Sequence, residues 1–383
     1  MTLARRHFLA GAGAMFAAPR ILFAQAATER RFVFILQRGA ADGLNTVVPL
    51  ADPAYASLRG ALAIEAAVAT RLDGSFGLHP ALKEFSALHA QGQALFVHAV
   101  ASPYRDRSHF DGQNVLESGG TAPHQLKDGW MNRLVGLLPR RGQGAIALAP
   151  TVPLALRGAA DVTSYAPSAL PPADDGLLQR VQQLYAGDAQ LHALWLAAMD
   201  ARGMAGAQGE GANRQNPAAV GRMAAGFLAQ PQGPRIAMIE TGGWDTHSAQ
   251  NPRLTARLKS LDTLVGSLKE GLGAAWQQTV VLVATEFGRT AAANGTGGTD
   301  HGTGSAALLA GGAVQGGRVI ADWPGLATSA LHEGRDLRPT LGLDALIASS
   351  AAECFGLDNE RVARTLFPRG TPAIKGLPRL VRA

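Results

Sequence analysis

The sequence predicts an α/β protein built as a three-layer sandwich, in which helices cover both faces of a mostly parallel central sheet. Short apolar runs, typical of strands buried on both faces, alternate along the chain with longer segments of helical periodicity. That alternation favours parallel strands joined by helices. The chain has 46 glycines in 383 residues and is 47% hydrophobic, a composition that suits tight loops around a large core.

The strongest predicted strand is the apolar run TVVLVAT, residues 279–285. The full set of predicted strands covers residues 32–37, 94–100, 145–149, 235–240, 279–285 and 306–310. The predicted helices begin at Ser108, run from Asp128 to Leu138, and cover residues 176–203, 252–276 and 339–355. We expect a single domain over residues 28–383, with residues 151–230 forming a mostly helical insertion.

Charge and cysteine content narrow the function classes. The net charge is +6, and the basic residues are scattered among acids with no basic run interleaved with aromatic residues. This pattern excludes the electrostatic footprint of a nucleic-acid-binding protein. Cys354 is the single cysteine, so the sequence excludes a disulfide within the chain and a zinc–thiolate site.

The N-terminus predicts export by the twin-arginine (Tat) machinery. Arg5 and Arg6 precede a Phe-Leu pair, a weakly apolar run and an Ala-Gln-Ala end, which together are typical of a cleaved signal over residues 1–27. The alternative is an amphipathic first helix of the mature fold. The apolar run is too short and too rich in Gly and Ala to span a bilayer, and no other segment qualifies. We therefore expect a periplasmic or extracellular location and no stable membrane span.

Polar residues that directly follow predicted strands are the candidates for a site, because ligands bind beyond the carboxyl ends of parallel strands. Asp, Glu and His without Cys are the ligand set of hydrolytic metal sites. We predict a divalent metal (Zn, Mn, Mg or Ca) held by residues of these loops, namely Asp42, Asp245, His247, Glu286, Asp300 and His301. The alternative role of each carboxylate is a helix cap or a loop hydrogen bond, and Asp300 alternatively orients His301.

The same loops carry groups that suit an anionic substrate. Arg38, Arg105 and Arg289 each follow a predicted strand. They either bind an anionic group or pair with the neighbouring carboxylates. Asn45, in the Gly-rich loop after the first strand, is a further candidate for substrate binding.

Several segments together resemble domain-of-unknown-function family 1501. They include RGAADGLNTVVP, ASPYRDRSHFDGQNVLESG, GGWDTH, TEFGRT and GGTDHGTGS, and the resemblance covers essentially the whole mature chain. The family consists of twin-arginine-exported bacterial proteins related to the alkaline phosphatase and sulfatase superfamily. The resemblance implies an alkaline phosphatase-like fold. It also implies hydrolysis of phosphate or sulfate esters with one or two divalent metals and a Ser, Thr or modified Cys nucleophile.

Position by position, the resemblance is incomplete. Asp42, Asp245, His247 and His301 match metal ligands of the superfamily. Glu286 stands where the superfamily has Asp, and the next residue is Phe287 where a metal-binding His is expected.

The superfamily's nucleophile position, counted back from Gly119, falls on His109, with Ser108 beside it. We take Ser108 as the candidate nucleophile and Ser102 as the second. The alternative for Ser108 is a helix-capping role.

The sequence thus predicts an exported, metal-dependent hydrolase of phosphate or sulfate esters, with Ser108, His109 and Arg289 acting on the substrate. A small anionic ester or an envelope polysaccharide is the expected substrate class. The alternative is a catalytically degenerate binding or assembly protein on the same fold, which the replacement at Phe287 motivates.

Overall fold

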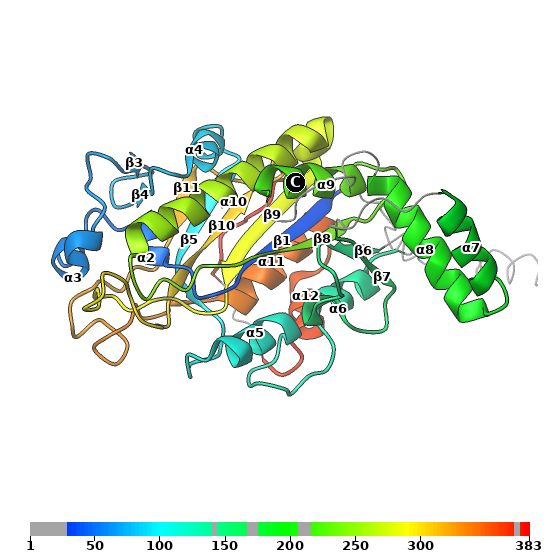
Figure 1. The fold of residues 1–383 in the computed structure, drawn as a ribbon. Helices are drawn as coiled ribbons and strands as arrows, with labels where there is room; N and C mark the ends of the chain where they lie inside the picture. The colour runs from blue at the N-terminus through cyan, green and yellow to red at the C-terminus, as the bar shows by residue number, and fades with distance from the viewer. Residues whose placement is uncertain (1–28, 140–143, 167–174, 206–215, 371–375) are drawn as a thin grey trace, which may run out of the picture.

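A nine-stranded sheet forms the centre of the molecule, with the strand order β11-β5-β10-β9-β1-β8-β6-β7 and with β12 paired to β5 (Figure 1). The computed structural model describes residues 29–139, 144–166, 175–205, 216–370 and 376–383, so the predicted signal peptide lies outside the described residues. The strands are β1 (Arg31–Gln37), β5 (Ala94–Ala101), β6 (Ala145–Ala147), β7 (Val162–Ser164), β8 (Ile236–Thr241), β9 (Thr279–Thr285), β10 (Ser305–Ala310), β11 (Arg318–Ile320) and β12 (Leu341–Gly342).

Alternate residues of β1 enter two separate cores, one on each face of the sheet. Phe32 and Phe34 join a core that includes residues of α6 (Trp130–Leu137), α11 (Leu343–Phe355) and α12 (Asn359–Leu366). Val33 and Ile35 join a core that includes residues of α4 (Lys83–Ala90), α9 (Pro217–Leu228) and α10 (Gln250–Leu272). The two helical layers on a mostly parallel sheet confirm the predicted fold class.

Strand β10 runs antiparallel to both of its neighbours, β5 and β9, whereas the other pairings in this sheet are parallel. The amino end of β10 therefore lies at the same edge as the carboxyl ends of β1, β5, β8 and β9. Residues that precede β10 can thus meet residues that follow the other strands. A smaller sheet, in the order β2-β4-β3, pairs Val47–Val48 with Gly77–Leu78 and Gly77–Leu78 with Thr70–Arg71.

The predicted helix over residues 176–203 is two helices, α7 (Asp175–Tyr185) and α8 (Ala189–Ala205). The break falls at Gly187 and Asp188, where the Asp188 carboxylate accepts hydrogen bonds from the backbone N–H groups of Gln190 and Leu191, each at 2.9 Å. An Asp at this position satisfies N–H groups that the first turn of a helix leaves free. The apolar periodicity indicated the helices but not the turn between them.

Residues 151–230 divide into parts that join the main body and a part that extends from it. Strand β7 pairs with β6 at the end of the sheet, and α9 packs along α10. Helices α7 and α8 extend away from the sheet beyond these elements (Figure 1). None of the described helices combines the length and apolarity that crossing a bilayer requires.

Two buried histidines make the stability of the fold depend on pH. The Nδ1 atoms of His79 and His98 accept backbone N–H groups, from Ala81 at 3.1 Å and from Ala99 at 2.8 Å. Burial lowers the pKa of each histidine from 6.5 to about 4. Because the folded pKa lies below the unfolded value, the unfolded chain binds more protons in this window. The stability that the two neutral histidines contribute to the fold is fully present above pH 6.5, and it is lost as the pH falls towards 4.

We expect the free energy of unfolding to fall with this titration, by about 3 kcal/mol per histidine at the acid end of the window. Urea unfolding across the window measures the fall. His79→Asn keeps an acceptor for the Ala81 N–H but cannot titrate, so this variant should show a smaller loss than the parent protein. An equal loss in His79→Asn would remove His79 as a cause.

Candidate metal centre

Four side chains with nitrogen or oxygen donors meet at the edge of the sheet where β5, β8 and β9 end and β10 begins. Asp245 and His247 follow β8, and His301 precedes β10. His109 is the first residue of α5 (His109–Ser118), which follows β5. One donor atom each from His109, Asp245 and His301 lies within 4.8 Å of the others, an arrangement that could hold a metal ion. The sequence predicted Asp245, His247 and His301 as ligands, and the structure brings these three together with His109.

Each of the three histidines has its Nδ1 atom next to a group that can only accept a hydrogen bond. His109 Nδ1 lies 2.9 Å from Glu286 Oε1, and His247 Nδ1 lies 3.0 Å from Asp300 Oδ1. His301 Nδ1 lies 2.9 Å from the carbonyl oxygen of Arg107. Because these partners have no proton to give, each neutral imidazole carries its proton on Nδ1 and an unshared electron pair on Nε2. This tautomer, oriented by a carboxylate or a carbonyl, is typical of metal-binding histidines.

The three Nε2 atoms are directed at the carboxylate of Asp245. Oδ1 lies 3.0 Å from His247 Nε2 and 3.4 Å from His301 Nε2, and Oδ2 lies 3.5 Å from His109 Nε2. The Nε2 atoms of His247 and His301 are 3.0 Å apart. Ligands at about 2.0–2.1 Å from a tetrahedral zinc ion lie about 3.3 Å from one another. The spacing of the donors therefore fits a small divalent metal.

The donor set also contains an atom that nothing else in the described chain satisfies. His109 Nε2 is buried and makes no hydrogen bond. The His109 ring stacks on Phe287, with ring centroids 5.1 Å apart, and meets the His301 ring edge-on at 4.3 Å. Phe287, at a position where a metal-binding His was expected, thus holds the ring of His109 in place from one side.

Glu286, predicted as a metal ligand, is instead enclosed by hydrogen-bond donors. Oε1 accepts from Gly39 N at 2.8 Å, from Gln113 Nε2 at 3.0 Å and from His109 Nδ1 at 2.9 Å, and Oε2 accepts from Thr285 Oγ1 at 2.9 Å. Burial alone would raise the pKa of Glu286, but the hydrogen bonds from His109 and Gln113 outweigh it and lower the pKa. The hydrogen bond from His109 to this carboxylate in turn raises the pKa of His109. Glu286 orients a ligand and is not itself directed at the cluster.

Asp300 likewise takes the alternative kind of role, because its carboxylate accepts from His247 and from Asn294 Nδ2. Asp300 was predicted as a metal ligand, with orientation of its neighbour His301 as the alternative, whereas its carboxylate orients His247. Arg289 Nη1 donates to Asp245 Oδ1 at 2.8 Å, and the Arg289 side chain is fully buried. Burial would raise the pKa of Asp245, but Arg289 lowers it overall. Arg289 therefore keeps Asp245 charged and in place rather than meeting solvent.

Asp42 was predicted as a metal ligand, but its carboxylate binds other residues of the protein. Both oxygens bind the guanidinium of Arg59, at 2.5 and 2.9 Å, and Oδ2 also accepts from Gln250 Nε2 at 2.6 Å. Asp42 also caps the short helix α2 (Gly43–Thr46) by accepting from Asn45 N. The side chains of Asp42 and Arg59 are 1% and 0% exposed, so this ion pair is part of the interior. We do not retain Asp42 as a metal ligand.

The candidate substrate-binding residues are also engaged within the protein. Arg38 binds Glu117 and Glu240 at 2.8 and 2.6 Å, and Arg105 donates to the carbonyl oxygens of Ser102 and Tyr104. Asn45 is fully buried, with Nδ2 donating to a carbonyl oxygen and Oδ1 accepting from a tyrosine hydroxyl. Arg38 therefore pairs with carboxylates, which is the second of the two roles expected for the arginines. Asn45 is no longer a candidate for contact with substrate.

The two candidate nucleophiles differ in their surroundings. Ser108 lies between Arg107, whose carbonyl oxygen binds His301, and His109, and it is the N-cap residue of α5 without using its side chain as a cap. Ser102 is buried and donates to the backbone carbonyl of Glu286 at 3.2 Å. The capping alternative for Ser108 is therefore not realised, which leaves its hydroxyl free of that role.

Three groups that contribute to the site were not predicted from the sequence. Gln113 connects Arg38 with Glu286, donating from Nε2 and accepting Arg38 Nη1 at 2.7 Å on Oε1. Its signal was its position one helical turn after His109, on the same face of α5. The carbonyl oxygen of Arg107 and the partner Arg59 of Asp42 carried no signal, since a backbone group has no sequence identity and Arg59 lies in a separate helix.

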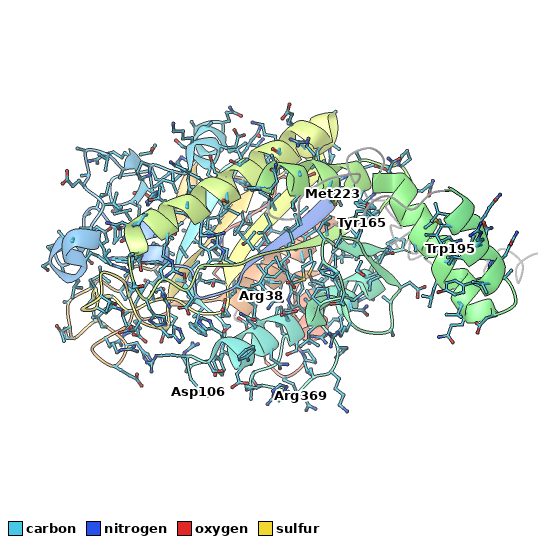
Figure 2. The ribbon with its side chains drawn as sticks, in the orientation of Figure 1. Arg38, Asp106, Tyr165, Trp195, Met223 and Arg369 are labelled. Carbon is cyan, nitrogen blue, oxygen red and sulfur yellow. The ribbon has the colours of Figure 1, made fainter. Side chains whose placement is uncertain are left out.

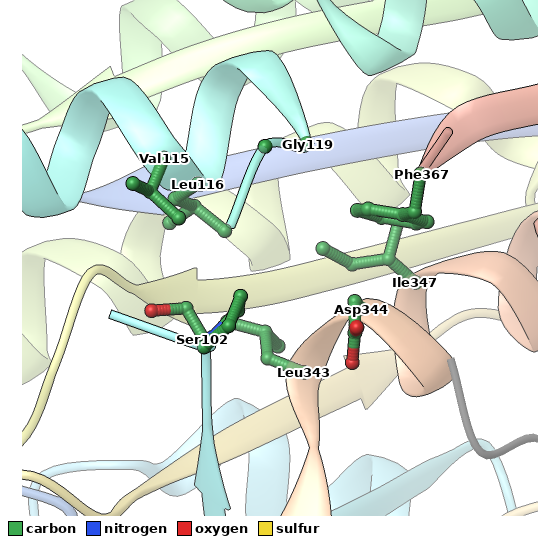
Figure 3. Close-up of a pocket in the computed structure, with 10 residues that line it drawn as sticks. Ser102, Val115, Leu116, Gly119, Leu343, Asp344, Ile347 and Phe367 are labelled. Atoms are coloured by element: carbon green, nitrogen blue, oxygen red, sulfur yellow. The ribbon is translucent and has the colours of Figure 1, made fainter. Parts of the chain in front are cut away.

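A small pocket in the described structure is lined by none of the ligands of this centre (Figure 3). It opens between α5 and α11, and Val115, Leu116, Leu343 and Phe367 form much of its wall. Ser102 and Asp344 supply its polar side chains, and burial raises the pKa of Asp344. The lining of this pocket includes none of the residues of the His–Asp cluster.

The family of the chain follows from a match that covers most of its length. The family model described as "Protein of unknown function (DUF1501)" matches residues 29–367. The chain belongs to the DUF1501 family. No curated protein sequence matches this DUF1501 protein.

Three solved structures are similar to the DUF1501 chain at low identity. One is the C-terminal periplasmic domain of EptC from Escherichia coli in complex with Zn, with 11% identity, 74% of each chain covered and a TM-score of 0.39. Another is Ps i-CgsB in complex with k-i-k-neocarrahexaose, with 12% identity, 88% of this chain and 75% of that chain covered and a TM-score of 0.42. The phosphonate monoester hydrolase of Agrobacterium radiobacter has 10% identity, 76% and 70% coverage and a TM-score of 0.35.

Proposed function

We propose that this DUF1501 protein is a metal-dependent hydrolase of a phosphate or sulfate ester, exported by the twin-arginine machinery to act in the periplasm or outside the cell. The catalytic part of this proposal is supported by the arrangement of the three histidines. Each Nδ1 atom is held by an acceptor, and each Nε2 atom is directed at Asp245. Export is supported by the paired arginines and the Ala-Gln-Ala end of the N-terminal segment.

The residues present fit a divalent metal. Asp245 and His301 belong to both sets of three close donors, one completed by His109 and the other by His247. Three protein ligands that leave a coordination position open are typical of catalytic zinc sites. When bound, the metal would act as a Lewis acid towards the oxygens of the ester.

The chain's own residues have distinct tasks in this proposal. Glu286, Asp300 and the carbonyl of Arg107 hold the imidazoles in the tautomer that binds a metal. Arg289 holds Asp245 ionised. Ser108, which precedes His109 in the chain, would attack the phosphorus or sulfur as the bond to the leaving alcohol breaks, with its hydroxyl proton passing to solvent. Water would then hydrolyse the resulting Ser108 ester and release phosphate or sulfate.

Removal of the Ser108 hydroxyl tests its role as the attacking group. In Ser108→Ala we expect kcat for p-nitrophenyl phosphate or p-nitrophenyl sulfate to fall at least about 100-fold, with metal content unchanged. Ser102→Ala is the matched control, since its hydroxyl bonds a backbone carbonyl in the interior, and it should keep its turnover. Unchanged turnover in Ser108→Ala would assign the attack to water.

The proposal as a whole is tested by elemental analysis of the mature protein, exported through its own signal and purified without chelator, followed by assays on phosphate and sulfate esters. We expect one equivalent of a divalent metal and turnover that a chelator abolishes. Absence of metal, together with no thermal shift on adding Zn, Mn, Mg or Ca, would contradict the proposal.

A binding or assembly protein that holds a metal without turnover is the second candidate. Two observations favour it: the Asp42 carboxylate is committed to Arg59, and Phe287 occupies a position where a ligand was expected. Both reduce the number of metals that the site can hold. Stoichiometric metal without turnover on any ester, and affinity for an envelope polysaccharide, would support this candidate over the hydrolase.

A further inference from the structure

Helices α7 and α8 form an antiparallel arm that extends from the main body past strand β7 (Figure 1). The turn between them is three residues long, from Ala186 to Asp188. They pack on each other through half-buried side chains, including Tyr185 and Trp195, whose rings meet edge-on with centroids 6.1 Å apart. Figure 2 shows Trp195 within the arm, far from the sheet.

The arm buries too little surface to be stable alone. No side chain described in residues 176–199 is buried. Helices of 11 and 17 residues are marginal in water unless an apolar face is packed against something. Several leucines of the arm remain exposed: Leu184 is 76% exposed, Leu191 is 40%, Leu194 is 60% and Leu196 is 50%.

Helical geometry places most of these side chains on one side of the arm. At about 100° per residue, Leu191, Leu194 and Ala198 fall within one sector of α8, to one side of the seam that Trp195 makes with α7. Leu184 lies on the flank of α7 that, in an antiparallel pair, faces the same way. We call this surface, formed by Leu184, Leu191, Leu194 and Ala198, the leucine face. Leu196 lies on the opposite side of the same seam.

The chemistry of the leucine face indicates its partner. Over α7, α8 and the turn between them the formally charged residues are Asp175, Arg180, Asp188, Asp200 and Arg202, a net formal charge of −1 from two Arg and three Asp. None of them belongs to the leucine face. Binding to a lipid surface uses basic residues on the polar side of a helix and aromatic anchors at the interface, but the arm has no lysine and Trp195 is turned towards α7. A neutral leucine and alanine surface instead suits close helix packing against an equally neutral surface, and its own copy provides one without charge repulsion.

We propose that the leucine face docks against the leucine face of a second copy of this chain, so that two arms form a four-helix bundle about a two-fold axis. Such an interface is self-complementary, because each copy contributes the same side chains. The bundle would cover the leucines that the single chain exposes. The proposal does not depend on the metal centre or on hydrolysis.

Sedimentation equilibrium of the mature protein tests the proposal with a pair of matched variants. Leu194→Glu places a charge in the leucine face and should weaken the dimer roughly 100-fold or more, because both copies carry the change at a central position. Leu196→Glu makes the same change on the same helix but on the opposite side, and should leave the dimer intact. Both variants should keep the circular dichroism and metal content of the parent protein.

Cysteine cross-linking gives a second readout. Cys354 is the single native cysteine and is buried, so an introduced thiol reacts alone. Leu194→Cys should form a disulfide-linked dimer under mild oxidation, and Leu196→Cys should not. A parent protein that is monomeric at micromolar concentration overturns the proposal, and so does a dimer that survives Leu194→Glu. Flotation of the monomer with phosphatidylglycerol vesicles would also overturn it, and would assign the leucine face to a bilayer.

Discussion

Alanine at Asp245 or at His301 is expected to abolish metal binding, whereas alanine at His109 or at His247 is expected only to weaken it. Asp245 and His301 belong to both sets of three close donors, while His109 and His247 each belong to one. Loss of a shared ligand leaves no complete set. Loss of either other histidine leaves three donors, which is enough for a catalytic site.

Glu286→Gln is the reference variant with which the losses of metal affinity in the alanine variants are compared. It keeps the shape of a residue that orients His109 but removes its charge, and loss of such a partner typically costs about 10–100-fold in metal affinity or activity. The Asp245→Ala and His301→Ala variants should lose more than Glu286→Gln, as measured by titration with Zn²⁺ or Co²⁺. Equal losses in all four alanine variants would contradict the shared-ligand arrangement, and metal binding retained in Asp245→Ala would remove the site.

Replacement of Asp42 with alanine should lower the free energy of unfolding by about 3–5 kcal/mol, because it strands the buried charge of Arg59. Metal content should stay unchanged, since the Asp42 carboxylate binds Arg59 and Gln250 and not the histidine cluster. Urea unfolding and elemental analysis of one preparation measure both quantities.

The double variant Asp42→Leu/Arg59→Met is the control for Asp42→Ala. Replacing both members of a buried pair by apolar side chains is often neutral, so the double variant should recover most of the lost stability. Loss of metal with little loss of stability in Asp42→Ala would restore Asp42 as a ligand. A double variant as unstable as the single variant would show that the helix cap and the Gln250 contact matter more than the ion pair.

Much of the fold could be predicted because a strand that is buried on both faces of a sheet is a continuous run of apolar residues in the sequence. The run at residues 279–285 is strand β9 with the same bounds, and the runs at residues 32–37 and 94–100 differ from β1 and β5 by one residue. The direction of β10 could not be predicted, because an apolar run has the same composition in either orientation. The turn at Gly187 and Asp188 was missed because the apolar spacing continues across it.

From the sequence, the site residues could be predicted only where their position next to the end of a strand determines that they meet. Asp245, His247 and His301 follow or precede strands that end at one edge, and they do meet. Asp42 satisfies the same criterion but meets Arg59, because α3 (Tyr55–Arg59) brings a cation to it from a part of the chain that the strand pattern does not describe. Position predicts which residues reach an edge, whereas the partners that neutralise or orient them depend on packing.

The direction of β10 also determines the order in which the site can assemble. Strand β5, which leads to His109, is paired only with β10, β11 and β12 in the described sheet, and all three lie beyond residue 304. A growing chain that has not yet made residues 305–342 therefore has no sheet partner for β5, and His109 has no fixed position relative to Asp245. The metal centre is complete only after nearly the whole chain has been synthesised. Under the proposed function, a metal would then be loaded late, onto a folded polypeptide, which is consistent with the proposed twin-arginine route because that route carries folded proteins.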